Sequence, residues 1–216
     1  MTRLATNPNN SRDRERRDRP ATEQAILDAF EHVLLRDGVR GLGVNSVAAE
    51  AGVNKVLIYR YFGDFPGLAK RWAEGSSIWP SALELIGNDP EAFATLDIRE
   101  RVRKVLGNYM EAIRKRPVTV ELIAAELVEP GEISRVLEEA LAKPATEVND
   151  YIRIGEGGAE VMEKVTRLNM VVSAVTAYIT IRERNNPQYL GIPLNDETWR
   201  QLRDTIDELA EKFLHA

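Results

Sequence analysis

Apolar side chains recur at alternating steps of three and four residues through most of this 216-residue chain. Such spacing lines one face of an α-helix, because about 3.6 residues complete one turn. The clearest examples lie near the two ends: Ile26, Ala29, Phe30, Val33 and Leu34, and then Trp199, Leu202, Ile206, Leu209 and Phe213. We find no convincing strand and no internal repeat, so the pattern predicts an all-α fold.

Glycines, prolines and capping residues divide this pattern into separate helices. The first predicted helix runs from Thr22 to Asp37, followed by short helices over 45–51 and 54–62 that meet at Gly52. A fourth begins at Asp64. The later helices are predicted to begin at the capping-box pattern of residues 97–100, at Pro117, at Glu132, near Ala159, and after the cap Asn195.

The charge of the chain is distributed unevenly, although its net value is only −5. Residues 1–20 hold six arginines and three acidic residues, residues 21–72 are balanced, and residues 73–216 hold 17 basic and 25 acidic residues. An acidic body repels DNA, so a contact with nucleic acid is expected only near the N-terminus. We divide the chain into a disordered basic arm (1–20), a helix-turn-helix DNA-binding domain (21–66) and a helical ligand-binding and dimerisation domain (67–216).

The segment VNSVAAEAGVNKVLIYRYF, residues 44–62, carries the strongest functional signal. Two short helices joined at a glycine-containing turn are typical of a helix-turn-helix, whose second helix enters the major groove of DNA. Lysine, arginine and asparagine suit base edges or phosphates, tyrosine hydroxyls suit phosphates, and an aliphatic side chain suits a thymine methyl. The outward-facing candidates are Asn54, Lys55, Val56, Leu57, Tyr59, Arg60 and Tyr61.

The string AGVNKVLIYRYF, together with the glycine-terminated helix before it, resembles the TetR family of bacterial transcriptional repressors. The resemblance implies a homodimer, a two-fold-symmetric operator in double-stranded DNA, and a small-molecule effector whose binding in the body weakens DNA binding. It also implies DNA contacts at Asn45, Lys55, Tyr59 and Tyr61.

Two positions depart from the family pattern. Val56 replaces a residue that is usually small, and Phe65-Pro66 stands where the family commonly has a phosphate-binding lysine. We expect Lys70, Arg71 or the N-terminal arm to compensate for that missing lysine.

The effector site is expected in the body, among aromatic or soft side chains with a few polar partners. The absence of a charged cluster favours a mostly apolar ligand. The candidate residues are Trp72, Trp79, Tyr109, Met110, Asn169, Thr176 and Tyr178. Any one of them can equally belong to the hydrophobic core.

The last two helices are predicted to form a dimer interface. Small residues on the penultimate helix allow close packing, and the last helix offers a narrow apolar seam, so two subunits can build a four-helix bundle. The candidates are Ser173, Ala177, Trp199, Leu202, Ile206, Leu209 and Phe213. The alternative is that both helices only close the core of one subunit.

Several classes of function find no support in the sequence. There is no cysteine, and His32 and His215 are the only histidines, so we expect no metal, no cofactor and no catalytic residues. No apolar run is long enough to span a membrane and none resembles a signal peptide, which predicts a cytoplasmic protein without a membrane partner. The alternative function is a helical interaction module or ligand sensor without regulated DNA binding; an enzyme ranks last.

Overall fold

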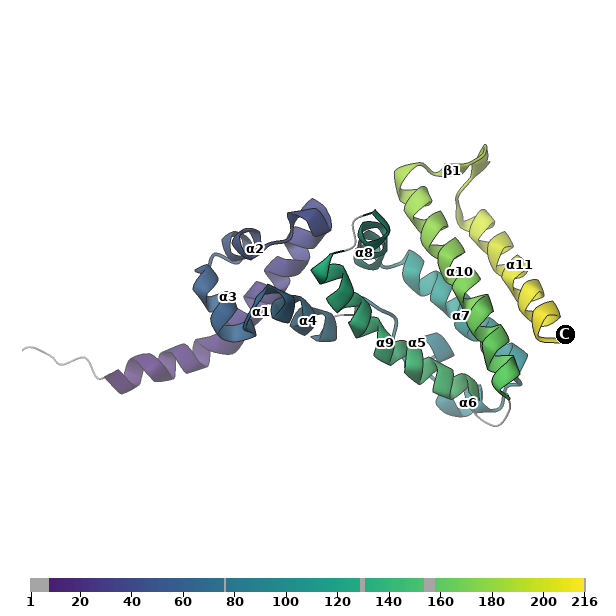
Figure 1. Cartoon of the computed structure of the whole chain (residues 1–216), viewed down its shortest axis with the longest axis horizontal. Coiled ribbons are helices and arrows are strands. Elements are labelled where there is room, and N and C mark those ends of the chain that lie inside the picture. Colours follow the sequence, from purple (N-terminus) through teal and green to yellow (C-terminus); the bar gives the residue numbers. More distant parts are fainter. Residues whose placement is uncertain (1–7, 76, 129–130, 154–157, 216) are drawn as a thin grey trace, which may run out of the picture. The chain divides into compact units, whose positions relative to one another are not determined.

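The computed structural model describes residues 8–75, 77–128, 131–153 and 158–215, and these are almost entirely helical (Figure 1). The prediction of an all-α fold is confirmed. The chain forms two compact units, Met1–Trp72 and Ala73–Ala216. The helices are α1 (Pro8–Gly41), α2 (Val44–Glu50), α3 (Lys55–Phe62), α4 (Phe65–Gly75), α5 (Ala82–Ile86), α6 (Pro90–Ala94), α7 (Ile98–Arg114), α8 (Pro117–Val128), α9 (Glu132–Arg153), α10 (Ala159–Asn185) and α11 (Asp196–His215).

Helix α1 begins at Pro8, well before the predicted start at Thr22. Residues 8–20, for which we predicted disorder, therefore continue the helix, while residues 1–7 of the predicted arm lie outside the described residues. Arginine and glutamate favour helices, and pairs four residues apart add to this: Arg19 Nε lies 2.6 Å from Glu23 Oε1. Gly38, with a φ of 69°, interrupts the helical geometry where a stop was predicted.

The core of the N-terminal unit, called the head below, is built around Phe30. Its ring centroid lies 5.8 Å from that of Phe65 and 4.9 Å from that of Trp72. The Trp72 indole also donates a hydrogen bond of 3.3 Å to Glu31 Oε2. Helices α1 and α4 are therefore joined by aromatic packing and by one polar contact.

The C-terminal unit, called the body below, is organised around α7. Helices α10 and α11 pack against α7 and against each other, and α5 and α9 also contact α7. The predicted capping box is confirmed: Asp97 accepts from the backbone of Arg99 and Glu100, and Glu100 accepts from the backbone of Asp97. The predicted cap at Asn195 is confirmed as well, because its Oδ1 accepts from the N–H groups of Glu197 and Thr198.

A short antiparallel hairpin, β1 (Gln188–Tyr189) and β2 (Ile192–Pro193), joins α10 to α11. Leu190 and Gly191 form its two-residue turn, both with positive φ, as tight hairpin turns of this kind require. Strands of two residues are too short to produce a recognisable alternation, so the sequence did not predict them. In the described part of the chain, no helix has the length and apolarity needed to cross a bilayer.

Candidate nucleic-acid interface and effector cavity

The turn between α2 and α3 ends α2 in a Schellman arrangement. The N–H of Val53 donates to the carbonyl of Ala48, and that of Gly52 to the carbonyl of Ala49. Gly52 has a φ of 65°, a conformation that only glycine adopts without strain. The predicted turn is therefore present, with its glycine at the position that needs one.

One face of α3 is exposed and has the composition of a DNA-reading surface. Lys55, Val56, Tyr59 and Arg60 are all exposed, Val56 to 62% and Tyr59 to 47%. Their spacing of i, i+1, i+4 and i+5 places them on one continuous side of the helix. Ile58 is fully buried on the opposite side. We call these four residues the recognition face.

Two asparagines flank the recognition face in different ways. Asn45 lies in the first turn of α2, is exposed, and its Oδ1 lies 3.5 Å from Lys55 Nζ, so the two side chains share one surface. Gly43 occupies the N-cap position of α2, so this helix begins one residue before the predicted range 45–51. Asn54 caps α3, with its Oδ1 accepting from the N–H of Val56 at 2.9 Å. Reading adenine through both amide atoms would require Asn54 to release this cap.

Leu57 and Tyr61 are only partly exposed, on the flank of α3 away from the recognition face. The Tyr61 ring packs edge-on against Phe62, and the guanidinium of Arg19 lies 5.1 Å from the centre of the Tyr61 ring. Sequence reasoning missed the contribution of Arg19, because the contact depends on α1 extending further toward the N-terminus than predicted. Arg19 thus adds a positive charge beside α3.

The only acidic residue in α2 and α3 is Glu50, and it is held by α1. Arg36 Nη1 donates to Glu50 Oε2 at 2.6 Å, and His32 Nδ1 lies 3.9 Å from the same carboxylate. The hydrogen bonds that Arg36 donates to the carboxylates of Asp37 and Glu50 raise the pKa of Arg36, which keeps its charge beside them. The partners of Glu50 offset its negative charge, leaving Lys55 and Arg60 to dominate near the recognition face.

The position that lacks the expected lysine contributes to the core of the head. Phe65 packs against Phe30, and Pro66 fits the first turn of α4, where a missing backbone N–H is tolerated. Lys70 and Arg71, which we expected to compensate, are both exposed on α4.

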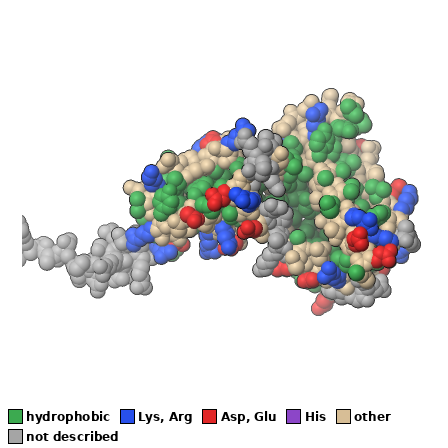
Figure 2. Space-filling model, viewed as in Figure 1, with side chains coloured by type: hydrophobic (Ala, Val, Ile, Leu, Met, Phe, Trp, Pro, Cys, Tyr) green, Lys and Arg blue, Asp and Glu red, His purple; other side chains and the backbone are tan. Residues whose placement is uncertain are grey.

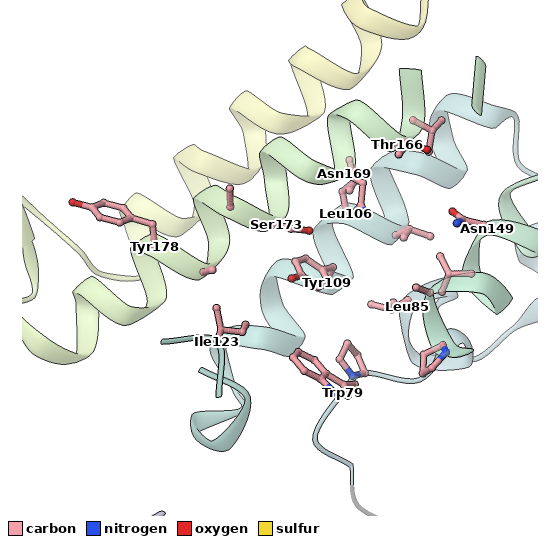
Figure 3. A pocket seen from close by; sticks show the side chains of 18 of the residues that line it. Trp79, Leu85, Leu106, Tyr109, Ile123, Asn149, Thr166, Asn169, Ser173 and Tyr178 are labelled. Atoms are coloured by element: carbon pink, nitrogen blue, oxygen red, sulfur yellow. The ribbon is translucent and has the colours of Figure 1, made fainter. Parts of the chain in front are cut away.

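The body contains a cavity of about 770 Å³, lined by residues of α5, α7, α8, α9, α10 and the segment before α5 (Figure 3). Its wall is mostly aliphatic. The cavity-lining residues are Trp79, Pro80, Leu85, Val102, Val105, Leu106, Tyr109, Ile123, Ala124, Leu127, Pro144, Ala145, Val148, Asn149, Ile152, Val165, Thr166, Asn169, Ser173, Ala174, Ala177, Tyr178, Ile181, Arg182 and Asn185. A volume of this order suits a drug-sized ligand.

Polar groups in the cavity are few and, apart from one, uncharged. Tyr109 of α7 and Ser173 of α10 are hydrogen-bonded partners whose hydroxyls face each other in Figure 3. Burial raises the pKa of Tyr109, so its phenol stays neutral. Among the described residues that line the cavity, only Arg182 is charged, and its Nε already donates to the carbonyl of Gln188.

Four of the seven predicted ligand-binding residues line the cavity: Trp79, Tyr109, Asn169 and Tyr178. The other three are corrected by the structure. Trp72 belongs to the core of the head, and Met110 lines a separate hollow of about 480 Å³ beside α11. Thr176 is fully buried and does not line the cavity. Sequence reasoning could not make these distinctions, because they depend on how far each helix is rotated.

The predicted dimer-interface residues also separate into groups. Trp199 and Ile206 are buried in the core of the body, and the Trp199 indole donates to Glu183 at 2.9 Å, so the prediction is wrong for both. Ser173 and Ala177 line the cavity of their own chain, and Leu202 packs against the core. Only Leu209 and Phe213 are exposed, with exposed fractions of 47% and 39%.

An exposed apolar strip nevertheless runs along α10 and α11. We define it as Met170, Val171, Tyr178, Leu209 and Phe213, all of which are exposed. Figure 2 shows hydrophobic side chains reaching the surface of the body. The strip lies on the two helices for which a dimer interface was predicted, and it shares Leu209 and Phe213 with the predicted residue set.

Comparison with known proteins supports the resemblance. Residues 26–65 match the family model of bacterial regulatory proteins of the tetR family. A TetR-family regulator from Mesorhizobium loti shares 14% identity over 91% of this chain and 96% of its own, with a TM-score of 0.56. A TetR-like regulator from Rhodococcus sp. RHA1 shares 16% identity over 90% and 96%, with a TM-score of 0.54.

A third solved structure, the transcriptional regulator FadR from Bacillus subtilis in complex with stearoyl-CoA, shares 18% identity over 87% of this chain and 96% of its own, with a TM-score of 0.52. The search of curated protein sequences returned no match. These structural likenesses establish the fold of the whole chain, and the family model establishes the head. Residues 26–65 therefore match the helix-turn-helix of the tetR family of bacterial regulatory proteins, and the chain shares its fold with solved TetR-family regulators.

Proposed function

We propose that the protein is a dimeric transcriptional repressor that leaves a two-fold-symmetric operator when a small, mostly apolar ligand binds in its body. The recognition face carries this proposal: four exposed side chains, two of them cationic, on one side of the helix that follows a helix-turn-helix turn. Such a helix fits the major groove with its N-terminal residues toward the bases.

The individual contacts follow from the geometry of α3. Lys55 is at the N-terminus of the helix, where it can reach a guanine edge or a phosphate, and Tyr59 lies one turn later on the same side. Val56 is exposed and suits a thymine methyl. Tyr61 is partly buried, and the guanidinium of Arg19 lies over its ring. We therefore assign to Tyr61 a contact with the phosphate backbone and not with a base.

The exposed apolar strip supports dimerisation. Apolar side chains that remain exposed on two neighbouring helices leave a surface whose burial against a second copy is favourable. A single short recognition helix reads few base pairs, so two heads are needed for useful affinity. In a dimer the two recognition helices would lie about 34–36 Å apart, one turn of DNA.

The cavity supports control by a ligand. It is largely aliphatic with a small number of hydrogen-bonding groups, as expected for a site that accepts a mostly apolar molecule. The FadR structure contains stearoyl-CoA, a ligand with a long apolar chain. Helix α4 contains the last residues of the head and the first of the body, so a ligand that favours one conformation of α4 would change the spacing of the two heads.

The test is to select a binding site from random DNA, and then to measure its affinity by gel shift across a salt series. We expect a protected two-fold-symmetric site whose affinity falls steeply with salt, because each phosphate contact releases counterions. Lys55→Ala should weaken binding, and should reduce the slope of log K against log salt by about 1 if Lys55 contacts a phosphate. Tyr59→Phe should weaken binding without changing the fold.

Lys115→Ala is the matched control, because Lys115 is an exposed lysine of the body that pairs with Glu111, four residues earlier. If Lys55→Ala and Lys115→Ala bind as the parent does, α3 is not the recognition helix. If no sequence is enriched even at low salt, the chain is instead an interaction module or ligand sensor without regulated DNA binding.

A further inference from the structure

The three tryptophans of the chain differ in how their indole N–H groups are satisfied. Trp72 donates to Glu31 at 3.3 Å, and Trp199 donates to Glu183 at 2.9 Å. The Nε1 atom of Trp79 is buried and has no hydrogen-bond partner among the described residues. A buried donor without an acceptor costs free energy, and such groups are rare in native proteins. Trp79 therefore needs an explanation.

The surroundings of Trp79 point to a ligand. Its ring forms part of the cavity wall, beside Pro80 and Leu85. Two hydrogen bonds hold the backbone immediately before it: the Thr119 hydroxyl donates to the carbonyl of Ile78, and Arg116 Nε donates to the carbonyl of Ser77 at 3.0 Å. The segment is therefore firmly held, while the most polar atom of its largest side chain is left unpaired.

We propose that Trp79 is the hydrogen-bonding anchor of the effector, and that the effector is an uncharged molecule with a carbonyl-type acceptor. On binding, the indole turns on its fixed backbone and donates its N–H to that acceptor, while the aliphatic wall encloses the rest of the molecule. Carboxylates in the head and in the core satisfy the other two tryptophans, whereas the described wall of the cavity contains no carboxylate. This proposal rests on the proposed function, because it assigns an anchor within the same effector site.

The test uses two rigid probes of the same shape, benzophenone and 1,1-diphenylethylene, which differ by one oxygen. In the full-length protein with ¹⁵N-labelled tryptophan, the three indole N–H groups give separate NMR signals, and Trp79→Phe assigns one of them. Benzophenone should shift the Trp79 signal downfield and leave those of Trp72 and Trp199 in place. Diphenylethylene should not produce the downfield shift.

Affinities of both probes for the parent and for Trp79→Phe isolate the hydrogen bond from shape and apolarity. We expect the parent to prefer benzophenone by about 2- to 12-fold, the range for one neutral hydrogen bond, and Trp79→Phe to lose this preference. Ile123→Val is the matched control, because it removes one methyl group from an aliphatic residue of the same cavity wall. It should leave the preference for benzophenone over diphenylethylene unchanged.

Equal affinities of the parent for the two probes, no binding of either, or an unmoved Trp79 signal would overturn the proposal. The NMR experiment on the parent decides the question even if Trp79→Phe does not fold. Because these measurements contain no DNA, their outcome does not depend on whether the protein binds an operator. A probe that engages Trp79 but leaves operator binding unchanged would refute ligand-controlled release and leave the anchor standing.

Discussion

Replacing Gly67 by alanine should distort the junction between α3 and α4. The peptide carbonyl of Phe62, at the end of α3, lies directly over the α-carbon of Gly67 in the first turn of α4. A β-carbon built at residue 67 overlaps the oxygen of that carbonyl and lies 3.0 Å from Asp64 Oδ1. The same Asp64 oxygen accepts the N–H of Gly67 at 2.6 Å, so it cannot move away without losing the cap of α4.

The size of the expected loss of stability depends on which atom the new β-carbon overlaps. The overlapping atom belongs to the backbone, so relief requires moving α3 relative to α4 rather than turning a flexible side chain. Overpacking of this kind costs about 1–3 kcal/mol, which exceeds the gain of roughly 0.4–1 kcal/mol from stiffening the unfolded chain. We therefore expect a net loss of about 1–2 kcal/mol in the stability of the head.

Gly75→Ala is the matched control, because Gly75 ends the same helix, has no positive φ, and a β-carbon there meets no atom within 4 Å. Urea unfolding followed by circular dichroism should show Gly67→Ala destabilised, and Gly75→Ala unchanged or slightly stabilised. Operator affinity should fall only for Gly67→Ala, because α3 carries the recognition face. Equal stability of the two variants would refute the packing of α3 on α4 described above.

Three further predictions concern the body. Asp97→Ala should lower the free energy of unfolding by about 1 kcal/mol at pH 7, because it removes a helix cap. The hydrogen bond from the Glu100 backbone N–H lowers the pKa of Asp97 in the folded protein, so the difference in stability between parent and variant should disappear as the pH falls below 3.8. Phe213→Asp combined with Leu209→Asp should give monomers in sedimentation, whereas Leu83→Asp, elsewhere on the surface, should not. Burial raises the pKa of the Tyr109 phenol above 10.0, so deprotonation of this residue in the unfolded chain destabilises the parent above pH 10. Tyr109→Phe lacks this contribution, so its melting temperature should fall less than that of the parent above pH 10.

Local signals in the sequence predicted the helix-turn-helix turn and two helix caps of the body well. The turn at Gly52 and the capping groups at Asp97 and Asn195 depend on residues within three or four positions of one another, so the sequence contains their whole cause. The start of α1 was misplaced, because charged residues near the N-terminus suit a solvated helix as well as a disordered arm. Composition alone does not separate these two states.

The residues of the effector site could not be predicted from local sequence patterns alone. Trp72 and Trp79 are seven residues apart, yet one packs on Phe30 in the head and the other lines the cavity of the body. Likewise Trp199 and Leu209 continue one apolar seam, yet the first is buried and the second is exposed. Periodicity identifies an apolar face but not what covers it, so such residues can be divided between core, cavity and interface only in three dimensions.

Helix α10 shows why this division matters for function. Its middle part, residues 168–181, carries no charge and meets three surroundings: Val172 is buried in the core, Ser173 and Ala177 border the cavity, and Met170 and Val171 belong to the exposed strip. A ligand that displaces α10 would therefore also move the proposed dimer surface. If benzophenone weakens operator binding and dimerisation together, control passes through α10. If operator binding weakens in an unchanged dimer, control passes instead through Trp79 and the segment that follows α4.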